Sequence, residues 1–255
     1  MRVLVTGGTG TLGSAVVRLL RERGHDPLIA SRRPGIGRVV VDFATGFGIA
    51  DAVEGVDAIV HAASDPGRHA KTTDVEGTRR LAETGIPVLY LSIIGVDVHP
   101  FRYYRIKREG EKTLAAVSGS WTVLRATQFH AFLDRMITMS RSAVQWFPGN
   151  GDRGDTHFPA VRGLMFQPVS HEEVAGRVID LLEVGPTNQI EQFAGPQQLE
   201  SAEIVEAWAR ARGGRPFYVP TAGRIARAFK EGYVLAAPEV STGTVTWDDY
   251  LQGNG

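Results

Sequence analysis

The fold is decided by one glycine-rich stretch near the start of the chain, Thr6-Gly7-Gly8-Thr9-Gly10-Thr11-Leu12-Gly13. It follows a short apolar run, Val3 to Val5, and precedes a segment in which apolar residues recur at helical spacing. This order predicts a strand, a tight turn and a helix, with Gly24 as a typical helix stop.

Two overlapping dinucleotide-binding patterns fit these glycines. Gly8, Gly10 and Gly13 give G-x-G-x-x-G, whereas Gly7, Gly10 and Gly13 give T-G-x-x-G-x-x-G. A pyrophosphate can approach the backbone only where no side chain intervenes, and the N–H groups of the first helical turn then face its charge. We therefore predict nucleotide binding by the residues of this turn: Gly7, Thr9, Gly10, Thr11, Leu12 and Gly13. A turn that only connects a strand to a helix is the alternative.

The end of the second predicted strand indicates which nucleotide binds. Pro27 to Ala30 is followed by Ser31, Arg32 and Arg33, with no acidic residue. In a dinucleotide fold an acid at this place binds the ribose 2′-hydroxyl of NAD, whereas arginine accommodates the 2′-phosphate of NADP. Forked guanidinium hydrogen bonds suit a phosphate, so this tripeptide favours NADP. Solvated loop arginines are the alternative.

Strands and helices alternate along the chain, which predicts an α/β fold of the Rossmann type, a doubly wound parallel sheet. Further strands are predicted at 38–41, 57–60 and 88–91, and helices at 46–53 and 72–83. Asp42 follows the third strand, where it could meet the adenine edge or cap the next helix. After the fourth strand come His61 and then the small residues Ala62, Ala63 and Ser64, which would let the backbone run beside the cofactor's ribose. We expect His61 to be structural.

The best candidates for chemistry are Tyr103 and Lys107, which form Y-x-x-x-K near the start of a helix predicted to end near Val117. Residues four apart share a helix face. A lysine ammonium beside a phenol lowers the phenol's pKa, and the phenol can then exchange a proton with a substrate oxygen while hydride moves. The same lysine can hydrogen-bond the nicotinamide ribose. A surface pair is the alternative, and Tyr104 competes with Tyr103 for the acid/base role.

Composition narrows the possible functions. The 255 residues are 43% apolar, without a run near the ~20 needed to span a bilayer. Cysteine is absent, which excludes disulfides, thiolate metal sites and cysteine nucleophiles, and the scattered histidines predict no metal site. Lys plus Arg equals Asp plus Glu at 28 each, so no basic field favours nucleic acid or anionic membranes. Met1-Arg2 leads directly into the first strand without a secretion signal. We expect a cytoplasmic protein with small-molecule partners and leave its oligomeric state open.

Several stretches resemble the extended or atypical branch of the short-chain dehydrogenase/reductase superfamily, with its NmrA-like NAD(P)H-binding members. TGGTGTLG is similar to the family's nucleotide fingerprint, HAAS to its fourth-strand turn, and residues 74–79, DVEGTR, to its D/N-V-x-G-T-x helix. Residues 124–130, LRATQFH, resemble the L-R-x-x-Q-F-H stretch of NmrA-like oxidoreductases.

The resemblance implies roles for particular residues. Ser92, Tyr103 and Lys107 would be the catalytic serine, tyrosine and lysine. Gln128, Phe129 and His130 would lie beside the nicotinamide in the substrate pocket. Two departures stand out: Ser92 is followed by Ile93 and Ile94 where the family usually has further Ser or Thr, and only 11 residues separate Ser92 from Tyr103.

We therefore predict an NADP-dependent oxidoreductase with a Rossmann domain at 1–130 and a smaller, mostly substrate-binding region at 131–255, interleaved with the Rossmann core. Its substrate would be a small, fairly apolar carbonyl, quinone or conjugated alkene. The aromatic and turn-rich stretch 146–155 is predicted to be a mobile loop or lid. The alternatives are a non-catalytic NADP(H) sensor of the NmrA type and a nucleotide-sugar epimerase or dehydratase.

Overall fold

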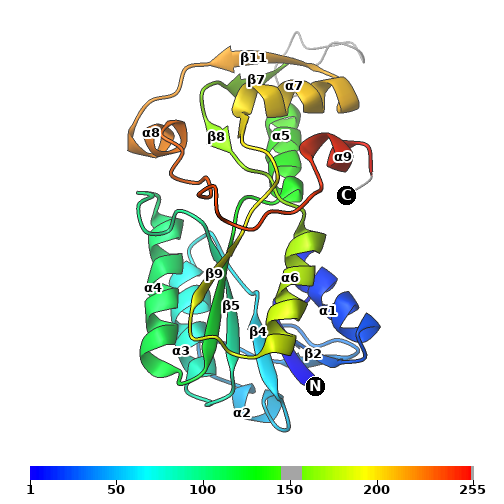
Figure 1. Ribbon diagram of the computed structural model, residues 1–255, viewed down its shortest axis with the longest axis vertical. Helices are drawn as coiled ribbons and strands as arrows, with labels where there is room; N and C mark the ends of the chain where they lie inside the picture. The colour runs from blue at the N-terminus through cyan, green and yellow to red at the C-terminus, as the bar shows by residue number, and fades with distance from the viewer. Residues whose placement is uncertain (145–156, 254–255) are drawn as a thin grey trace. The chain divides into compact units, whose positions relative to one another are not determined.

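The glycine-rich stretch forms the turn between the first strand and the first helix of a parallel sheet, as predicted (Figure 1). The structure is a computed structural model that describes residues 1–144 and 157–253. The predicted loop at 146–155 lies outside the described residues. The chain divides into two compact units. Unit 1 comprises Met1–Asp97, Phe101–Ala126 and His171–Phe193, and unit 2 comprises Val98–Pro100, Thr127–Ser170 and Ala194–Gly255.

Unit 1 holds a seven-stranded sheet in the order β3-β2-β1-β4-β5-β6-β9, and every neighbouring pair is parallel. Its strands are β1 (Arg2–Thr6), β2 (Asp26–Ser31), β3 (Arg38–Val40), β4 (Ala58–His61), β5 (Val88–Ile93), β6 (Trp121–Ala126) and β9 (Ile190–Phe193). The order reverses between β1 and β4, where ligands of open α/β sheets bind beyond the carboxyl ends of the strands. The predicted Rossmann-type sheet is confirmed.

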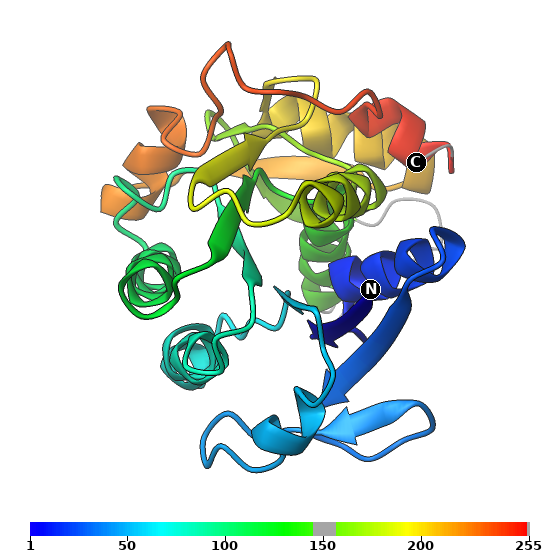
Figure 2. The same cartoon turned by 60° about the horizontal axis from the view of Figure 1, so that its bottom comes forward.

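Helices cover both faces of this sheet. They are α1 (Thr11–Glu22), α2 (Ile49–Ala52), the π-helical turn η1 (Thr72–Glu76), α3 (Gly77–Ala82), α4 (Arg102–Val117) and α6 (His171–Val184). Figures 1 and 2 show α3 and α4 on one face, and α1 with α6 on the other. Because α6 and β9 complete unit 1, part of the predicted second region, 131–255, belongs to the sheet unit.

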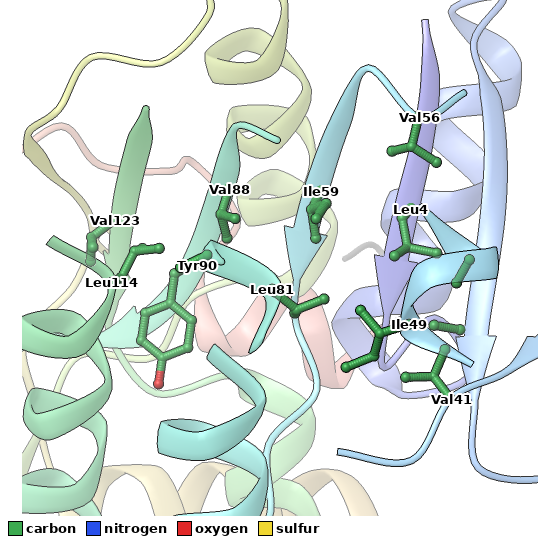
Figure 3. Close-up of a cluster of buried hydrophobic side chains, with 13 residues drawn as sticks. Leu4, Val41, Ile49, Val56, Ile59, Leu81, Val88, Tyr90, Leu114 and Val123 are labelled. Carbon is green, nitrogen blue, oxygen red and sulfur yellow. The ribbon is translucent and has the colours of Figure 1, made fainter. Parts of the chain in front are cut away.

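The strands of unit 1 are nearly continuous apolar runs in the sequence, because the strands of a parallel sheet are buried on both faces. One cluster joins the sheet to α2, α3 and α4 through Leu4, Ile49, Leu81, Leu114 and Val123 (Figure 3). Each fully buried side chain of this kind contributes about 1.5–3 kcal/mol relative to exposure. Tyr90 belongs to the same cluster, and its hydroxyl points away from the apolar side chains (Figure 3).

Unit 2 is built from short elements around its own core. They are α5 (His130–Val144), β7 (His157–Val161), β8 (Met165–Phe166), β10 (Leu199–Glu200), α7 (Ser201–Arg212), β11 (Arg215–Val219), α8 (Arg224–Lys230) and α9 (Trp247–Leu251). β7 pairs with β11 in parallel, and β8 pairs with β10 antiparallel. Phe158 and Trp208 pack edge to face in the core, where Trp247 is also buried.

The helix predicted at 72–83 is not α-helical throughout. The observed segment opens with the π-helical turn η1 and continues as the α-helix α3. The carbonyl of Asp74 in this turn accepts hydrogen bonds from Thr78 Oγ1 at 2.9 Å and from Tyr90 Oη at 3.3 Å. Helix α4 approaches the same carbonyl at Gly110, where a Cβ would lie 2.2 Å from it. Local π-helical geometry often accompanies functional sites.

We predict that Gly110→Ala destabilises the protein by about 1–3 kcal/mol, because the new methyl group would overlap the Asp74 carbonyl and force α4 away from η1. Gly176→Ala is the matched control, because Gly176 is also helical but has no atom within 4 Å of its Cβ position. The control should gain roughly 0.5–1 kcal/mol in helix propensity. Urea unfolding followed by circular dichroism measures both changes. Equal stability of the two variants would contradict the close approach.

Candidate functional site

The glycine turn brings three backbone segments together. Gly7 has a φ of +69°, and a Cβ on it would lie 2.6 Å from the backbone N of Ala63, just beyond β4. A Cβ on Gly13 would lie 2.1 Å from the Gly7 carbonyl oxygen. A Cβ on Gly8 would instead lie nearest to side-chain atoms of Ile29 and Val17, the closest being Cγ2 of Ile29 at 3.0 Å. Of the two overlapping patterns, the backbone therefore requires the one formed by Gly7, Gly10 and Gly13.

The start of α1 can hold an anion. Its N-cap, Gly10, has no side chain to satisfy the first N–H groups, and the first turn contains no acidic residue. Thr9, Gly10 and Thr11 are exposed, whereas the Leu12 side chain is buried and anchors the helix. Unsatisfied N–H groups and the helix dipole favour negative charge at such a terminus. The turn thus fits the pyrophosphate of a dinucleotide.

The segment after β2 carries the two arginines. Ser31 is the last residue of β2, and its Oγ accepts a hydrogen bond of 3.2 Å from the Arg33 backbone N–H. The Arg32 and Arg33 side chains are exposed, and neither joins an ion pair with another described residue. Both guanidinium groups are therefore available to an anionic ligand.

Asp42 supports a turn rather than a helix end. Its carboxylate accepts hydrogen bonds from the Ala44 N–H at 2.8 Å and from Thr45 Oγ1 at 3.2 Å. Helix α2 begins later, after its N-cap residue Gly48, which has a left-handed φ of +75°. No side chain forms a capping hydrogen bond at this helix start. The predicted capping of this helix by Asp42 is therefore wrong, and its contact with an adenine edge stays a prediction.

The end of β4 lies beside the glycine turn. His61 is the last residue of this strand rather than part of the turn beyond it. Thr6 Oγ1 accepts a hydrogen bond from the Ala63 N–H at 3.2 Å and lies 2.6 Å from Nδ1 of His61. Ala62 donates its N–H to the Thr6 carbonyl. Burial lowers the pKa of His61 to about 4, and the nearby Lys107 ammonium acts in the same direction, so this imidazole is neutral at pH 7.

Lys107 is held in the interior by a carboxylate. Its Nζ lies 3.0 Å from Oδ1 of Asp74 and 4.0 Å from the centroid of the Tyr90 ring. Only 3% of the Lys107 side chain is exposed, and none of Asp74. Burial alone would lower the pKa of Lys107, but Tyr90 and Asp74 reverse the effect and raise it. The ion pair is therefore a fixed, buried part of unit 1.

Tyr103 is tied to the same carboxylate through a serine. Its hydroxyl lies 2.5 Å from Ser64 Oγ, which in turn donates to Oδ1 of Asp74 at 2.8 Å. Tyr103 is half-buried, whereas the ring of Tyr104 is buried and packs near Phe101. Of the two tyrosines, Tyr103 thus faces the turn after β4.

The acidity of Tyr103 differs from the expectation. Burial and the charge of Asp74 raise the pKa of its phenol well above its usual value. Lys107 contacts Asp74 and Tyr90, and it does not contribute to the shift at Tyr103. The prediction that Lys107 depresses this pKa is therefore wrong for this arrangement, because the lysine is neutralised by Asp74.

Ser92 lies within β5, which extends to Ile93. Its side chain is buried, with 6% exposure, and Oγ has no hydrogen-bond partner in the described part of the chain. Ile94 is buried and Ile93 half-buried. An unpaired buried hydroxyl is costly unless a ligand or water satisfies it, and contact of Ser92 Oγ with a substrate oxygen stays a prediction.

The residues predicted for the substrate pocket lie in unit 2. Gln128 is buried, donates from Nε2 to the Val234 carbonyl at 3.3 Å and accepts from the Gln167 N–H at 3.1 Å. His130 is fully buried and stacks on Tyr250, with ring centroids 5.2 Å apart. Phe129 forms a bridge with Val169. Gln128 and His130 thus serve the interior of unit 2, and contact of these three residues with a substrate stays a prediction.

Two members of the site were missed from the sequence. Asp74 begins the D-V-x-G-T motif. A carboxylate on an otherwise mostly apolar helix face could have predicted a buried charge at this position. Tyr90 lies in an apolar strand and carried no signal of its own. Both residues reach Lys107 only through the packing of η1 and β5 against α4.

Among residues 1–144 and 157–253, no group of three His, Cys, Asp or Glu side chains could hold a metal ion. None of their helices is long and apolar enough to cross a membrane.

Known proteins resemble this chain in sequence and in fold. The model of the NAD dependent epimerase/dehydratase family matches residues 3–85. The chain is 26% identical to the human epimerase family protein SDR39U1, over 89% of this chain and 86% of that protein. It is 24% identical to the NAD(P)H azoreductase of Xenophilus azovorans, over 95% and 90% of the two chains.

Solved structures share the fold. A short-chain dehydrogenase/reductase superfamily protein from Agrobacterium tumefaciens with bound NAD superimposes with a TM-score of 0.73 and 19% identity, covering 100% of this chain and 96% of that one. The parallel sheet, the glycine turn and the matched family model agree with one another. The chain is therefore similar in sequence to epimerase/dehydratase-type NAD-dependent proteins, and it shares the Rossmann-type fold of the short-chain dehydrogenase/reductase structure.

Proposed function

We propose that this enzyme is an NADP-dependent oxidoreductase that transfers hydride to or from a small, fairly apolar carbonyl, quinone or conjugated alkene, as in NmrA-like members of the superfamily. One observation carries the proposal. The glycine turn after β1, the Ala62–Ser64 segment after β4 and Ser92 on β5 all lie toward the carboxyl ends of parallel strands within unit 1. Tyr103 and Lys107 join them through Ser64 and Asp74.

The side chains suit distinct tasks in such a reaction. When bound, the nicotinamide supplies or accepts the hydride. Lys107 has three N–H donors, of which Asp74 occupies one, so another can reach a ribose hydroxyl. Tyr103 would exchange a proton with the substrate oxygen, and the unpaired hydroxyl of Ser92 would orient that oxygen.

The cofactor preference rests on the segment after β2. Arg32 and Arg33 are exposed and outside any ion pair of the described residues, and Ser31 adds a hydroxyl at the same strand end. These groups fit a ribose 2′-phosphate better than a 2′-hydroxyl. The azoreductase relative, named for NAD(P)H, supports a reductive activity of this kind.

A second candidate is a nucleotide-sugar epimerase or dehydratase. The matched family model and the human epimerase-family relative favour it. Incubation with UDP- and dTDP-hexoses and NAD(P)⁺, followed by chromatography, distinguishes the two. Conversion of a sugar nucleotide without net consumption of cofactor would replace the first proposal with the second. If neither these sugar nucleotides nor a panel of carbonyl and quinone substrates is turned over, while NADP(H) binds tightly, the protein is instead a sensor.

We predict that Tyr103→Phe lowers kcat by about 10²–10⁴-fold with a carbonyl or quinone substrate, because the proton donor is removed. Binding of NADPH, measured by fluorescence titration, should stay within about twofold. Tyr104→Phe is the matched control and should keep its activity, because that ring packs in the interior. If Tyr103→Phe turns over at the rate of the native enzyme, Tyr103 has no part in the proton transfer.

We also predict that Arg32→Ala combined with Arg33→Ala weakens NADPH binding by about 10–100-fold and NADH binding by much less. Each charge-assisted hydrogen bond to the 2′-phosphate is worth roughly 1.5–3 kcal/mol, and NADH lacks that phosphate. Arg21→Ala, an exposed arginine in the last turn of α1, is the control and should change neither affinity. Equal weakening of both cofactors would rule out the 2′-phosphate assignment.

A further inference from the structure

We propose that Ser64 is a positioning residue that links the Tyr103 phenol to the buried Asp74–Lys107 pair, and that this chain of hydrogen bonds holds the phenol as a proton donor. The site is then set for reduction of a substrate rather than for oxidation of an alcohol. The chemical consequence rests on the proposed function of Tyr103, whereas the linkage itself rests on the geometry of unit 1.

The direction of each hydrogen bond follows from the number of protons available. A serine hydroxyl has a single proton, and Ser64 donates it to Oδ1 of Asp74 at 2.8 Å. The contact of 2.5 Å between Ser64 Oγ and Tyr103 Oη must therefore use the proton of the phenol. Tyr103 donates to Ser64, and Ser64 donates to Asp74. Such a chain stabilises the protonated phenol, and the hydrogen bond to Ser64 would lower the pKa of Tyr103 only if Ser64 donated to the phenolate instead of to Asp74.

The carboxylate at the end of this chain is fixed in place. Asp74 is fully buried, and its Oδ1 also accepts from Nζ of Lys107 at 3.0 Å. Its Oδ2 accepts from the Asp65 N–H at 3.3 Å. All three groups, Ser64, the Asp65 N–H and Lys107, are donors, so the carboxylate is the acceptor in each of these contacts.

The charges around the phenol also favour its protonated form. Burial raises the pKa of Tyr103, and Asp74 on η1 and Asp65 after β4 raise it further by disfavouring a phenolate. The other titratable groups nearby are Lys107 on α4, which is paired with Asp74, Tyr90 on β5, which is neutral, and His61 on β4, which is neutral at pH 7. No free cation among them opposes the two carboxylates.

This arrangement favours one direction of reaction. In reduction, the O–H bond of Tyr103 breaks while a new O–H bond forms on the substrate oxygen, and the bound reduced nicotinamide is the two-electron reductant. The phenolate regains its proton from solvent, since Tyr103 is half-buried and Ser64 is exposed. Oxidation of an alcohol needs the phenolate first, which the hydrogen-bond chain and both carboxylates disfavour.

The linkage is tested without any turnover, by ¹³C NMR titration of protein labelled at tyrosine Cζ, with Tyr103 assigned from the signal lost in Tyr103→Phe. In the native protein the Tyr103 signal should titrate above the ordinary tyrosine pKa of about 10. Asp74→Asn should lower the titration midpoint by about 1–3 pH units, because a negative charge is removed and Lys107 loses its partner. Ser64→Ala should lower the midpoint by less, because the phenol loses only its acceptor. Ser118→Ala is the control: its hydroxyl bonds to Ser120 at the other end of α4, and the Tyr103 midpoint should not move.

The outcomes separate this inference from the proposed function. An unchanged or raised Tyr103 midpoint in folded Ser64→Ala overturns the linkage, and that variant decides alone if Asp74→Asn fails to fold. With a reversible substrate couple, alcohol oxidation by the native enzyme should rise only at alkaline pH, and Asp74→Asn should move that rise to lower pH by the shift seen in the NMR titration. A native enzyme that oxidises the alcohol equally well at pH 7 overturns the preference for reduction. If no substrate turns over, the oxidoreductase proposal fails while the titration still decides the linkage.

Discussion

Direct contact of backbone with backbone organises unit 1. Where β1 ends, Gly7 lies against the backbone of Ala63, and Gly13 lies against the Gly7 carbonyl. No side chain fits at either contact, so the end of β1, the first turn of α1 and the segment after β4 converge. This convergence exposes N–H groups of the helix start at the point where the strand order reverses. The same contacts that fold the sheet thus create its ligand-binding edge.

A second contact of this kind builds the chemical part of the site. Gly110 lets α4 approach the Asp74 carbonyl and the Tyr90 hydroxyl, and Lys107 lies one turn earlier on the same helix. This approach buries the Lys107 ammonium against the Asp74 carboxylate. Removing one partner from a buried ion pair typically costs about 3–5 kcal/mol, because the remaining charge is left without compensation. The pair therefore fixes the position of α4, and through Ser64 it also orients Tyr103.

Unit 2 uses its conspicuous polar residues for its own interior. Asp134 on α5 accepts hydrogen bonds from Trp208 Nε1 at 2.6 Å and from Tyr250 Oη at 2.9 Å. Tyr250 in turn stacks on His130. Buried polar groups need such partners, so a histidine or glutamine near a predicted substrate region can serve packing first. The family-like stretch at 124–130 did not reveal this use by itself, because Val234, which contacts Gln128, and Tyr250, which stacks on His130, lie more than a hundred residues away along the chain.

The sheet, the glycine turn and the places of Ser92 on a strand and of Tyr103 and Lys107 on a helix were all predictable from the sequence, because strand and helix periodicities and glycine spacing are local properties. The sequence also placed Asp42 and the Ser31–Arg33 segment at the ends of strands. It did not predict that the Asp42 carboxylate accepts the hydrogen bonds of the following turn. Only the tertiary structure decided which groups meet. Lys107 pairs with Asp74 rather than acting on Tyr103, and Tyr103 bonds to Ser64, which lies 39 residues earlier. Burial and charge set the acidity of these groups, and both depend on helix packing across the sheet, which residue spacing along one helix does not encode.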